Sequence, residues 1–149
     1  MVRDDKILLL KHRKLGVWLP PGGHVEPGET PLDTVHREVK EESGYKIKII
    51  NPYADERVLI HDEGIADEQV RPLVIFLEYV KFKDGNHTHF DMIYLAEPGN
   101  SLPVPAESSN DMKWFNKEEI EKLDTYPNCK RAAIIALEKY NGTGRPQDR

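Results

Sequence analysis

Residues 23–45 read GHVEPGETPLDTVHREVKEESGY, a glycine-bearing loop that runs into a well-marked helix. Thr30 can cap the helix, Pro31 suits its first position, and Asp33 lies three residues past the cap. Gly44 is typical of the residue that ends a helix, because that position often adopts a left-handed conformation. The stretch therefore predicts a single helix between Thr30 and Gly44.

Three carboxylates lie on one side of the end of this helix. At about 100° per residue, Glu38, Glu41 and Glu42 fall within one arc, next to the arc that faces the core. They repel one another and also lie at the negative end of the helix dipole. A solvated acidic face, paired locally with Arg37 and Lys40, is one interpretation. A bound Mg²⁺, which prefers oxygen ligands, is the other.

The whole stretch resembles the signature of the Nudix hydrolase (MutT-like) family, G-x5-E-x7-R-E-U-x-E-E-x-G-U, where U is a bulky hydrophobic residue. Seven fixed positions match by chance with a probability on the order of 10⁻⁸. Tyr45 fills the last position, where the family more often has an aliphatic residue. The flanking segments WLPPGG and MKWFNKEEIEKL also resemble the family. The matching positions are Gly23, Glu29, Arg37, Glu38, Glu41, Glu42 and Gly44.

The resemblance implies hydrolysis of a nucleoside diphosphate linked to another group X, with Mg²⁺ or Mn²⁺ as cofactor. By position, Glu38 and Glu42 would be the principal metal ligands. Glu41 would be a further ligand or would hold a metal-bound water. The Gly22 carbonyl would complete the coordination. The supporting residues would be Arg37, which orients the carboxylates, and Glu29.

The general base and the substrate contacts stay open at this level. The base could be a helix glutamate, Glu38 or Glu41, or an acid before Trp114, Glu107 or Asp111. Each loop acid could equally be a solvated surface charge. The candidate substrate contacts are Gly23 in the loop, Trp18 for stacking on a base, His89 on a polar strand face and Arg13 in a basic run. Each of three contacts has an alternative. Trp18 could pack in the core, His89 could lie on a plain polar or metal-binding face, and Arg13 could lie in a solvated turn.

Composition restricts the class of protein. The 149 residues suit one domain, expected over 1–141 and followed by a flexible tail over 142–149. A net charge of −5 argues against binding duplex nucleic acid. The single cysteine, Cys129, excludes an internal disulfide and suits a reducing compartment. With no apolar run long enough to span a membrane, the expected location is cytoplasmic.

The remaining pattern predicts an α/β (α+β type) sandwich with a mixed β-sheet. A strong hairpin turn is expected at Asp84-Gly85-Asn86. Strands are expected at 6–10, 16–20, 45–50, 57–60, 70–80, 87–96 and 112–115, and further helices at 117–124 and 128–140. Only Met1-Val2-Arg3 precede the first turn, where the family normally has a strand, so an unpaired sheet edge is expected to favour a homodimer.

The leading hypothesis is therefore a metal-dependent pyrophosphohydrolase of nucleotide or nucleotide-sugar substrates. The alternative is a non-catalytic Nudix-fold module that senses a nucleotide or serves a regulatory role. The intact set of repelling carboxylates favours the enzyme, because a module that does not bind metal has no need to keep them together. The identity of X is not determined by these residues.

Overall fold

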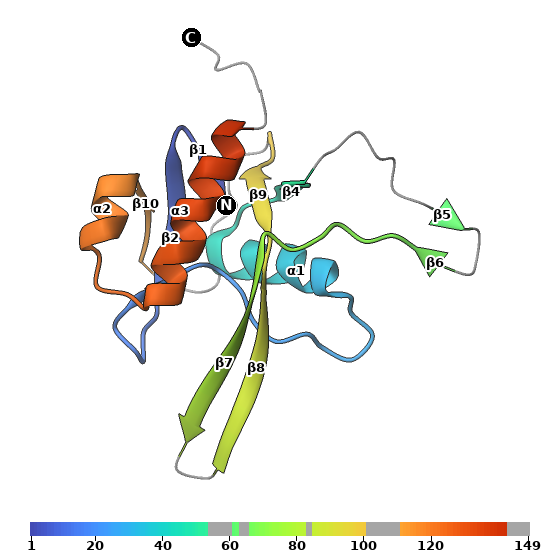
Figure 1. Ribbon diagram of the computed structural model, residues 1–149, viewed down its shortest axis with the longest axis horizontal. Coiled ribbons are helices and arrows are strands. Elements are labelled where there is room, and N and C mark those ends of the chain that lie inside the picture. Colours follow the sequence, from blue (N-terminus) through green and yellow to red (C-terminus); the bar gives the residue numbers. More distant parts are fainter. Residues whose placement is uncertain (54–60, 63–65, 83–84, 101–110, 143–149) are drawn as a thin grey trace.

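The computed structural model describes residues 1–53, 61–62, 66–82, 85–100 and 111–142, which form helices and antiparallel strands (Figure 1). The three helices of this part are α1 (Pro31–Ser43), α2 (Lys117–Lys122) and α3 (Pro127–Gly142). Its strands are β1 (Val2–Arg3), β2 (Lys6–Lys11), β3 (Trp18–Leu19), β4 (Ile47–Ile50), β5 (His61–Asp62), β6 (Ala66–Asp67), β7 (Val74–Phe82), β8 (Gly85–Ile93), β9 (Leu95–Pro98) and β10 (Met112–Phe115). The predicted α+β class is confirmed.

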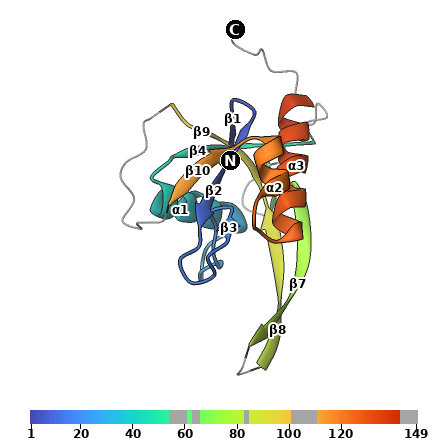
Figure 2. The same ribbon diagram turned by 90° about the vertical axis from the view of Figure 1, so that its left-hand side faces the viewer.

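The strand β2 lies at the centre of the sheet and is buried on both faces. It pairs with β1, β3 and β10, in each case antiparallel. Figure 2 shows α1 on one side of β2 and β10, and α2 with α3 on the other. This placement explains the unbroken apolar run ILLL at residues 7–10, since a strand covered on both faces has no polar side to present.

Alternate residues of β2 pack into two separate clusters. Leu8 packs with Val39 of α1 and with Tyr45, whereas Ile7 and Leu9 pack with residues of α2 and α3. Leu8 is fully buried, and burying a leucine side chain contributes about 2 kcal/mol. Tyr45, the departure from the signature, is also buried and contacts Trp114 edge-on at a centroid distance of 6.1 Å. Its aromatic ring therefore fills the space behind α1.

Several predicted boundaries differ from the observed ones. Strand β7 begins at Val74, not at residue 70, because Pro72 has no N–H and restricts the residue before it. The predicted strand 87–96 is divided at Tyr94: β8 pairs with β7, while β9 leaves this hairpin and pairs with β4. The predicted strand 57–60 lies outside the described residues.

The hairpin itself is confirmed, but its turn is shifted. Phe82 pairs with Gly85, so the connection is residues 83–84, which the structure does not describe. Gly85 and Asn86 belong to β8, where Gly85 has a φ of +133° that other residues rarely adopt. Helix α3 continues through Gly142, the first residue of the expected tail, and residues 143–149 lie outside the described part. Within the described ranges, no helix is long and apolar enough to span a bilayer.

Candidate active site

Helix α1 has the ends that its sequence predicts. Thr30 and Asp33 form a reciprocal capping box: the Asp33 N–H donates to Thr30 Oγ1 at 3.2 Å, and the Thr30 N–H donates to Asp33 Oδ2 at 2.9 Å. Gly44 closes the other end with a φ of 74°, and its N–H donates to the Lys40 carbonyl at 2.9 Å. These caps hold the helix register, and the register decides which way the glutamates point.

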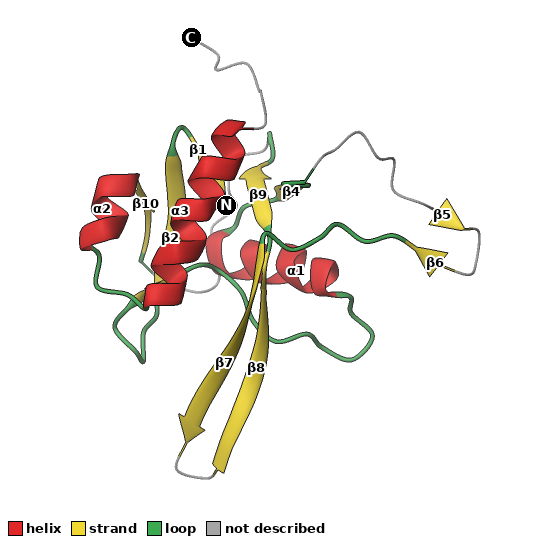
Figure 3. Ribbon diagram, viewed as in Figure 1, coloured by secondary structure: helices red, strands yellow, loops and turns green. Residues whose placement is uncertain are grey.

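The loop between β3 and α1 runs back along the helix, and Figure 3 shows this segment in green. Contacts pair the start of the loop with the end of the helix. Gly22 contacts Glu42, Gly23 lies against Glu38, and the His24 carbonyl accepts a hydrogen bond from Arg37. Loop and helix therefore form one antiparallel unit that presents backbone groups to the carboxylates.

Arg37 joins this loop to the carboxylates through a fork of hydrogen bonds. Its Nε donates to Glu29 Oε1 at 2.6 Å, and its Nη2 donates to Glu29 Oε2 at 3.0 Å. Its Nη1 donates to Glu38 Oε1 at 2.7 Å and to Glu41 Oε2 at 3.4 Å. A planar guanidinium makes such paired contacts, whereas a lysine ammonium does not. Arg37 thus orients several carboxylates at once.

Glu29 is held as a carboxylate by this fork. The Arg37 hydrogen bonds, followed by that of Thr34, lower the pKa of Glu29 to about 2. Thr34 Oγ1 donates to Glu29 Oε2 at 2.7 Å and is itself only 4% exposed. Glu29 in return raises the pKa of Arg37 above its ordinary value. Glu29 therefore stays charged and keeps the guanidinium in place.

Two carboxylates converge on the dipeptide Gly22–Gly23. The Gly22 N–H donates to Glu42 Oε2 at 3.0 Å. A Cβ on Gly23 would lie 2.9 Å from Glu38 Oε2 and closer still to Oε1, so a side chain at this position would require the carboxylate to move. Burial raises the pKa of Glu42, and repulsion from Glu38 and Glu41 raises it further, against the effect of the Gly22 hydrogen bond. Glu42 therefore binds a proton more readily than an ordinary exposed glutamate does.

The residues present fit a hard divalent cation in donor chemistry. Within the described ranges, no three His, Cys, Asp or Glu side chains are already gathered around one point. Instead, Glu38 accepts a hydrogen bond from Arg37, and Glu42 accepts one from the loop backbone at Gly22. Both side chains carry oxygen donors and lie one helical turn apart beside the same glycines, and Glu41 is 60% exposed next to them. These are ligands of the kind that Mg²⁺ takes.

His89, a predicted substrate contact, lies beside this loop. Its ring contacts that of His24 edge-on at 5.2 Å and that of His87 at 4.7 Å. On the same face of the hairpin, Asp91 is half-buried, and burial, followed by repulsion from Glu78, raises its pKa. Sequence reasoning missed His24, although it directly follows Gly23 and so had to lie near the carboxylates.

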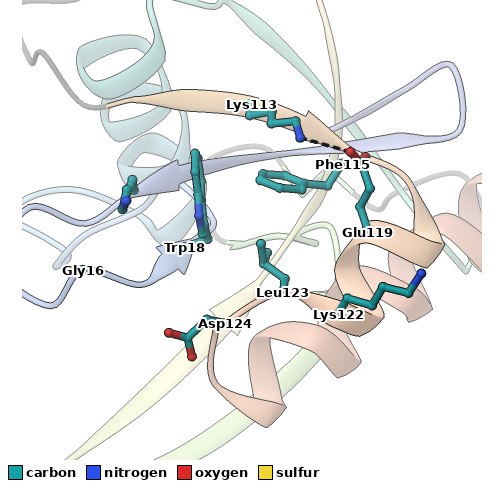
Figure 4. Close-up of a pocket in the computed structure, with 9 residues that line it drawn as sticks. Gly16, Trp18, Lys113, Phe115, Glu119, Lys122, Leu123 and Asp124 are labelled. Atoms are coloured by element: carbon teal, nitrogen blue, oxygen red, sulfur yellow. Dashed lines mark hydrogen bonds and ion pairs between the residues drawn. The ribbon is translucent and has the colours of Figure 1, made fainter.

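Trp18 lies in β3, and Arg13 lies in the turn before it. Trp18 lines a pocket of about 500 Å³ between β3, β10 and α2 (Figure 4). Its ring packs edge-on against Phe115 at 4.9 Å, so it belongs both to the core and to the pocket wall. Lys11, Lys113 and Lys122 also line this pocket. Arg13 lies in the exposed turn that is closed by the hydrogen bond from the Gly16 N–H to the His12 carbonyl.

The loop acids are only partly described. The Asp111 carbonyl accepts a hydrogen bond from the Lys11 N–H at 2.8 Å, which places this residue at the end of β2 and β10. Its side chain is exposed. Glu107 lies outside the described residues. The hydrogen bond of Asp111 joins it to β2 and not to the carboxylates of α1.

Comparison with known proteins agrees with this geometry. The sequence model of the NUDIX domain matches residues 1–137. An uncharacterized Nudix hydrolase, YvcI of Bacillus subtilis, is 30% identical over 127 residues, which are 83% of this chain and 66% of that protein. The nucleoside triphosphatase NudI of an Enterobacter species is 28% identical over 114 residues, covering 73% of this chain and 68% of that protein. The chain thus spans about two thirds of the length of these relatives.

A solved structure shows the same fold. The crystal structure of a NUDIX-family hydrolase from Clostridium perfringens superposes with a TM-score of 0.71 at 28% identity. The match covers 92% of this chain and 91% of the other.

Proposed function

This chain belongs to the Nudix hydrolase family, a family of pyrophosphohydrolases, and we propose that it hydrolyses the pyrophosphate linkage of a nucleotide-type substrate with Mg²⁺ as cofactor. The observation that carries the proposal is the Arg37 network. It holds Glu29, Glu38 and Glu41 together, while Glu38 and Glu42 converge on one pair of glycines. Like charges are kept together here at a cost in stability, which a cation would offset.

Each group has a defined task in this proposal. The chemistry that a bound Mg²⁺ supplies is neutralisation of the pyrophosphate oxygens and activation of a water for attack on phosphorus. Glu38 and Glu42 would hold the ion, with Glu41 beside them and the Gly22 carbonyl as a further donor. Arg37 fixes the direction of the carboxylates, because a metal site depends on the groups that orient its ligands. Gly23 leaves room for Glu38.

Substrate contacts are proposed on both sides of the loop. His24 and His89 would face the part of the substrate nearest the carboxylates. Trp18 is four residues before Gly22, so its pocket begins within about 14 Å of that residue along an extended chain. That span suits a nucleotide whose base or X group reaches the pocket, where Lys11 contributes a positive charge. Arg13 is the outermost contact of this proposal.

The substrate class is proposed from the site and from a relative. NudI is named a nucleoside triphosphatase, so nucleoside triphosphates come first in the substrate panel. ADP-ribose, nucleotide sugars and dinucleoside polyphosphates complete it. The half-buried single cysteine, Cys129, supports a reducing, cytoplasmic location as part of the same proposal.

The test is phosphate release from this panel, with and without Mg²⁺, for the wild type, for Glu42→Gln and for the control Glu121→Gln, whose side chain is exposed on α2. We expect Mg²⁺-dependent release by the wild type and the control, and its loss in Glu42→Gln. Mg²⁺ should also raise the melting temperature of the wild type more than that of Glu42→Gln. Absence of release from any substrate, with nucleotide binding intact, would support the non-catalytic sensing module instead.

The general base has a separate test. The candidates for the general base are Glu38, Glu41, Glu107 and Asp111. If a loop acid takes the proton, Glu107→Gln or Asp111→Asn should lower kcat by roughly 10²-fold or more while Mg²⁺ binding is unchanged. Normal rates in both variants would return the role to a helix glutamate.

A further inference from the structure

The β7–β8 hairpin carries an apolar face that the rest of the described structure leaves open. The two strands pair along nine register positions, from Val74–Ile93 to Phe82–Gly85. Figures 1 and 2 both show the hairpin extending away from the helices as a two-stranded ribbon. A two-stranded ribbon is marginally stable in water by itself, so a covering layer would stabilise it.

One face of the hairpin is turned to the rest of the protein. Asn128 Nδ2 of α3 donates to Glu78 Oε1 at 2.5 Å, and the His89 ring contacts that of His24. Asp91, on the same face, is half-buried. Alternation places Glu78, His89 and Asp91 on this face together with apolar side chains such as Phe76 and Val80, because side chains two apart on a strand share a face.

The opposite face is apolar and exposed. It consists of three cross-strand pairs, Ile75–Met92, Leu77–Phe90 and Tyr79–Thr88. The exposed fractions of its large side chains are 54% for Ile75, 45% for Leu77, 75% for Tyr79, 71% for Phe90 and 39% for Met92. An antiparallel hairpin normally turns its polar residues to water and its apolar ones to the core. Here a face with five large apolar side chains is turned to water.

The area of this face is large for a monomer. With about 200 Å² for each fully exposed large side chain, the observed fractions leave roughly 550–600 Å² of apolar surface. Typical monomers have a largest patch of about 300–600 Å², so this one lies at the upper end. Such a face on a protruding ribbon is typical of an interaction surface.

We propose that this face packs against the same face of a second copy of the chain and forms a symmetric homodimer. Two copies would bury about 1,100–1,200 Å², which exceeds the roughly 1,000 Å² expected of a specific interface. None of the six paired positions carries a charge. Two copies of the face therefore do not repel each other, and the face has no charged group that would select a different, charged partner. A two-fold axis makes one patch meet its own copy, as a closed dimer requires.

The register defines the centre of the interface. Leu77 and Phe90 form the middle of the three pairs, so a two-fold axis through the face brings these side chains against their counterparts. Two sheets packed face to face lie about 10 Å apart, a distance that large apolar side chains fill. Lys81 and Asn86, the next residues of this face toward the tip, are polar and would form the rim.

The test is sedimentation velocity of the full chain between about 1 and 200 μM. We expect a monomer–dimer equilibrium for the wild type, and dimer affinity weakened by roughly 30-fold or more in Leu77→Lys and Phe90→Ser. The matched controls are Leu15→Lys and Tyr126→Ser, whose side chains are 53% and 45% exposed elsewhere on the molecule. These controls should dimerise like the wild type.

Circular dichroism melts of all variants separate loss of the dimer from loss of the fold. If Leu77→Lys does not fold, the test rests on Phe90→Ser, which removes apolar area without adding a charge. A wild type that stays monomeric up to 200 μM overturns the proposal. A dimer of unchanged affinity in the folded hairpin variants overturns it equally, because another surface would then hold the copies together. Both readouts are independent of catalytic activity.

Discussion

Replacing Arg37 by lysine keeps one positive charge and removes the fork. The guanidinium makes hydrogen bonds of 2.6 and 3.0 Å to the two oxygens of Glu29, one of 2.7 Å to Glu38 and one of 3.2 Å to the His24 carbonyl. A lysine has its three donors on one nitrogen, so it reaches one of these groups well and not all three. Arg37 is 23% exposed, so water replaces the lost contacts only in part.

The expected result is a folded enzyme with slow turnover. Groups that orient metal ligands typically change metal affinity or activity by 10–100-fold, and Arg37 touches three carboxylates. We therefore expect Arg37→Lys to lower kcat by about 10- to 100-fold at saturating Mg²⁺. Arg37→Gln should lose more, because the repulsion between the glutamates is then unrelieved.

The assay is steady-state kinetics on the best substrate of the panel, with melting temperatures measured in parallel. Arg131→Lys is the matched control, since Arg131 is exposed on α3. It should behave like the wild type. If Arg37→Lys also retains full kcat, Arg37 acts as a counter-charge only, and the orienting role argued from the fork is wrong.

Three further predictions use other parts of the molecule. Gly23→Ala should lose most of its turnover, because its Cβ would displace the Glu38 carboxylate. Gly22→Ala has open space at its Cβ and should keep its activity. Equal rates for the two variants would contradict this prediction. The pKa of Glu29 is lowered to about 2, so its stabilising effect is complete above the ordinary value of about 4.5 and is lost as the pH falls toward 2. The difference in melting temperature between wild type and Glu29→Gln should therefore shrink from pH 5 to pH 2.5, and a constant difference would refute the assignment. Burial raises the pKa of Cys129 to about 11. A thiol reagent should therefore react slowly with the native protein at pH 7.5 and quickly after unfolding. Fast reaction of the native protein would show an accessible thiolate and contradict this prediction.

Local signals were sufficient wherever neighbouring residues decide the conformation. The caps at Thr30 and Gly44 follow from side-chain and backbone preferences within a few residues, and both are observed. The helical repeat alone places the three glutamates on one side, because the repeat depends only on backbone geometry. The Asp-Gly-Asn stretch indicated a hairpin, and the hairpin is observed, with Gly85 and Asn86 inside β8 and not in the turn.

Longer-range features needed the folded chain. The division of the predicted strand at Tyr94 arises because β8 and β9 pair with different strands, and that choice is made by distant residues. The contact between His24 and His89 joins residues that lie 65 positions apart. Nothing in the immediate neighbourhood of either histidine indicates the other.

The sequence by itself determined the helix, its caps, the spacing of the carboxylates and the family, because each depends on residues close together in the chain. The tertiary structure alone decided which face of the β7–β8 hairpin is covered. Alternation shows that Leu77 shares one face with Tyr79, and Glu78 lies on the other, but it does not say which face meets the core. Both faces carry large apolar side chains, Phe76 and Val80 on one and Leu77 and Phe90 on the other, so the pattern alone assigns neither face to the interior. The structure places the Leu77 face outside, because α3 and the glycine loop contact the opposite face through Asn128 and His24.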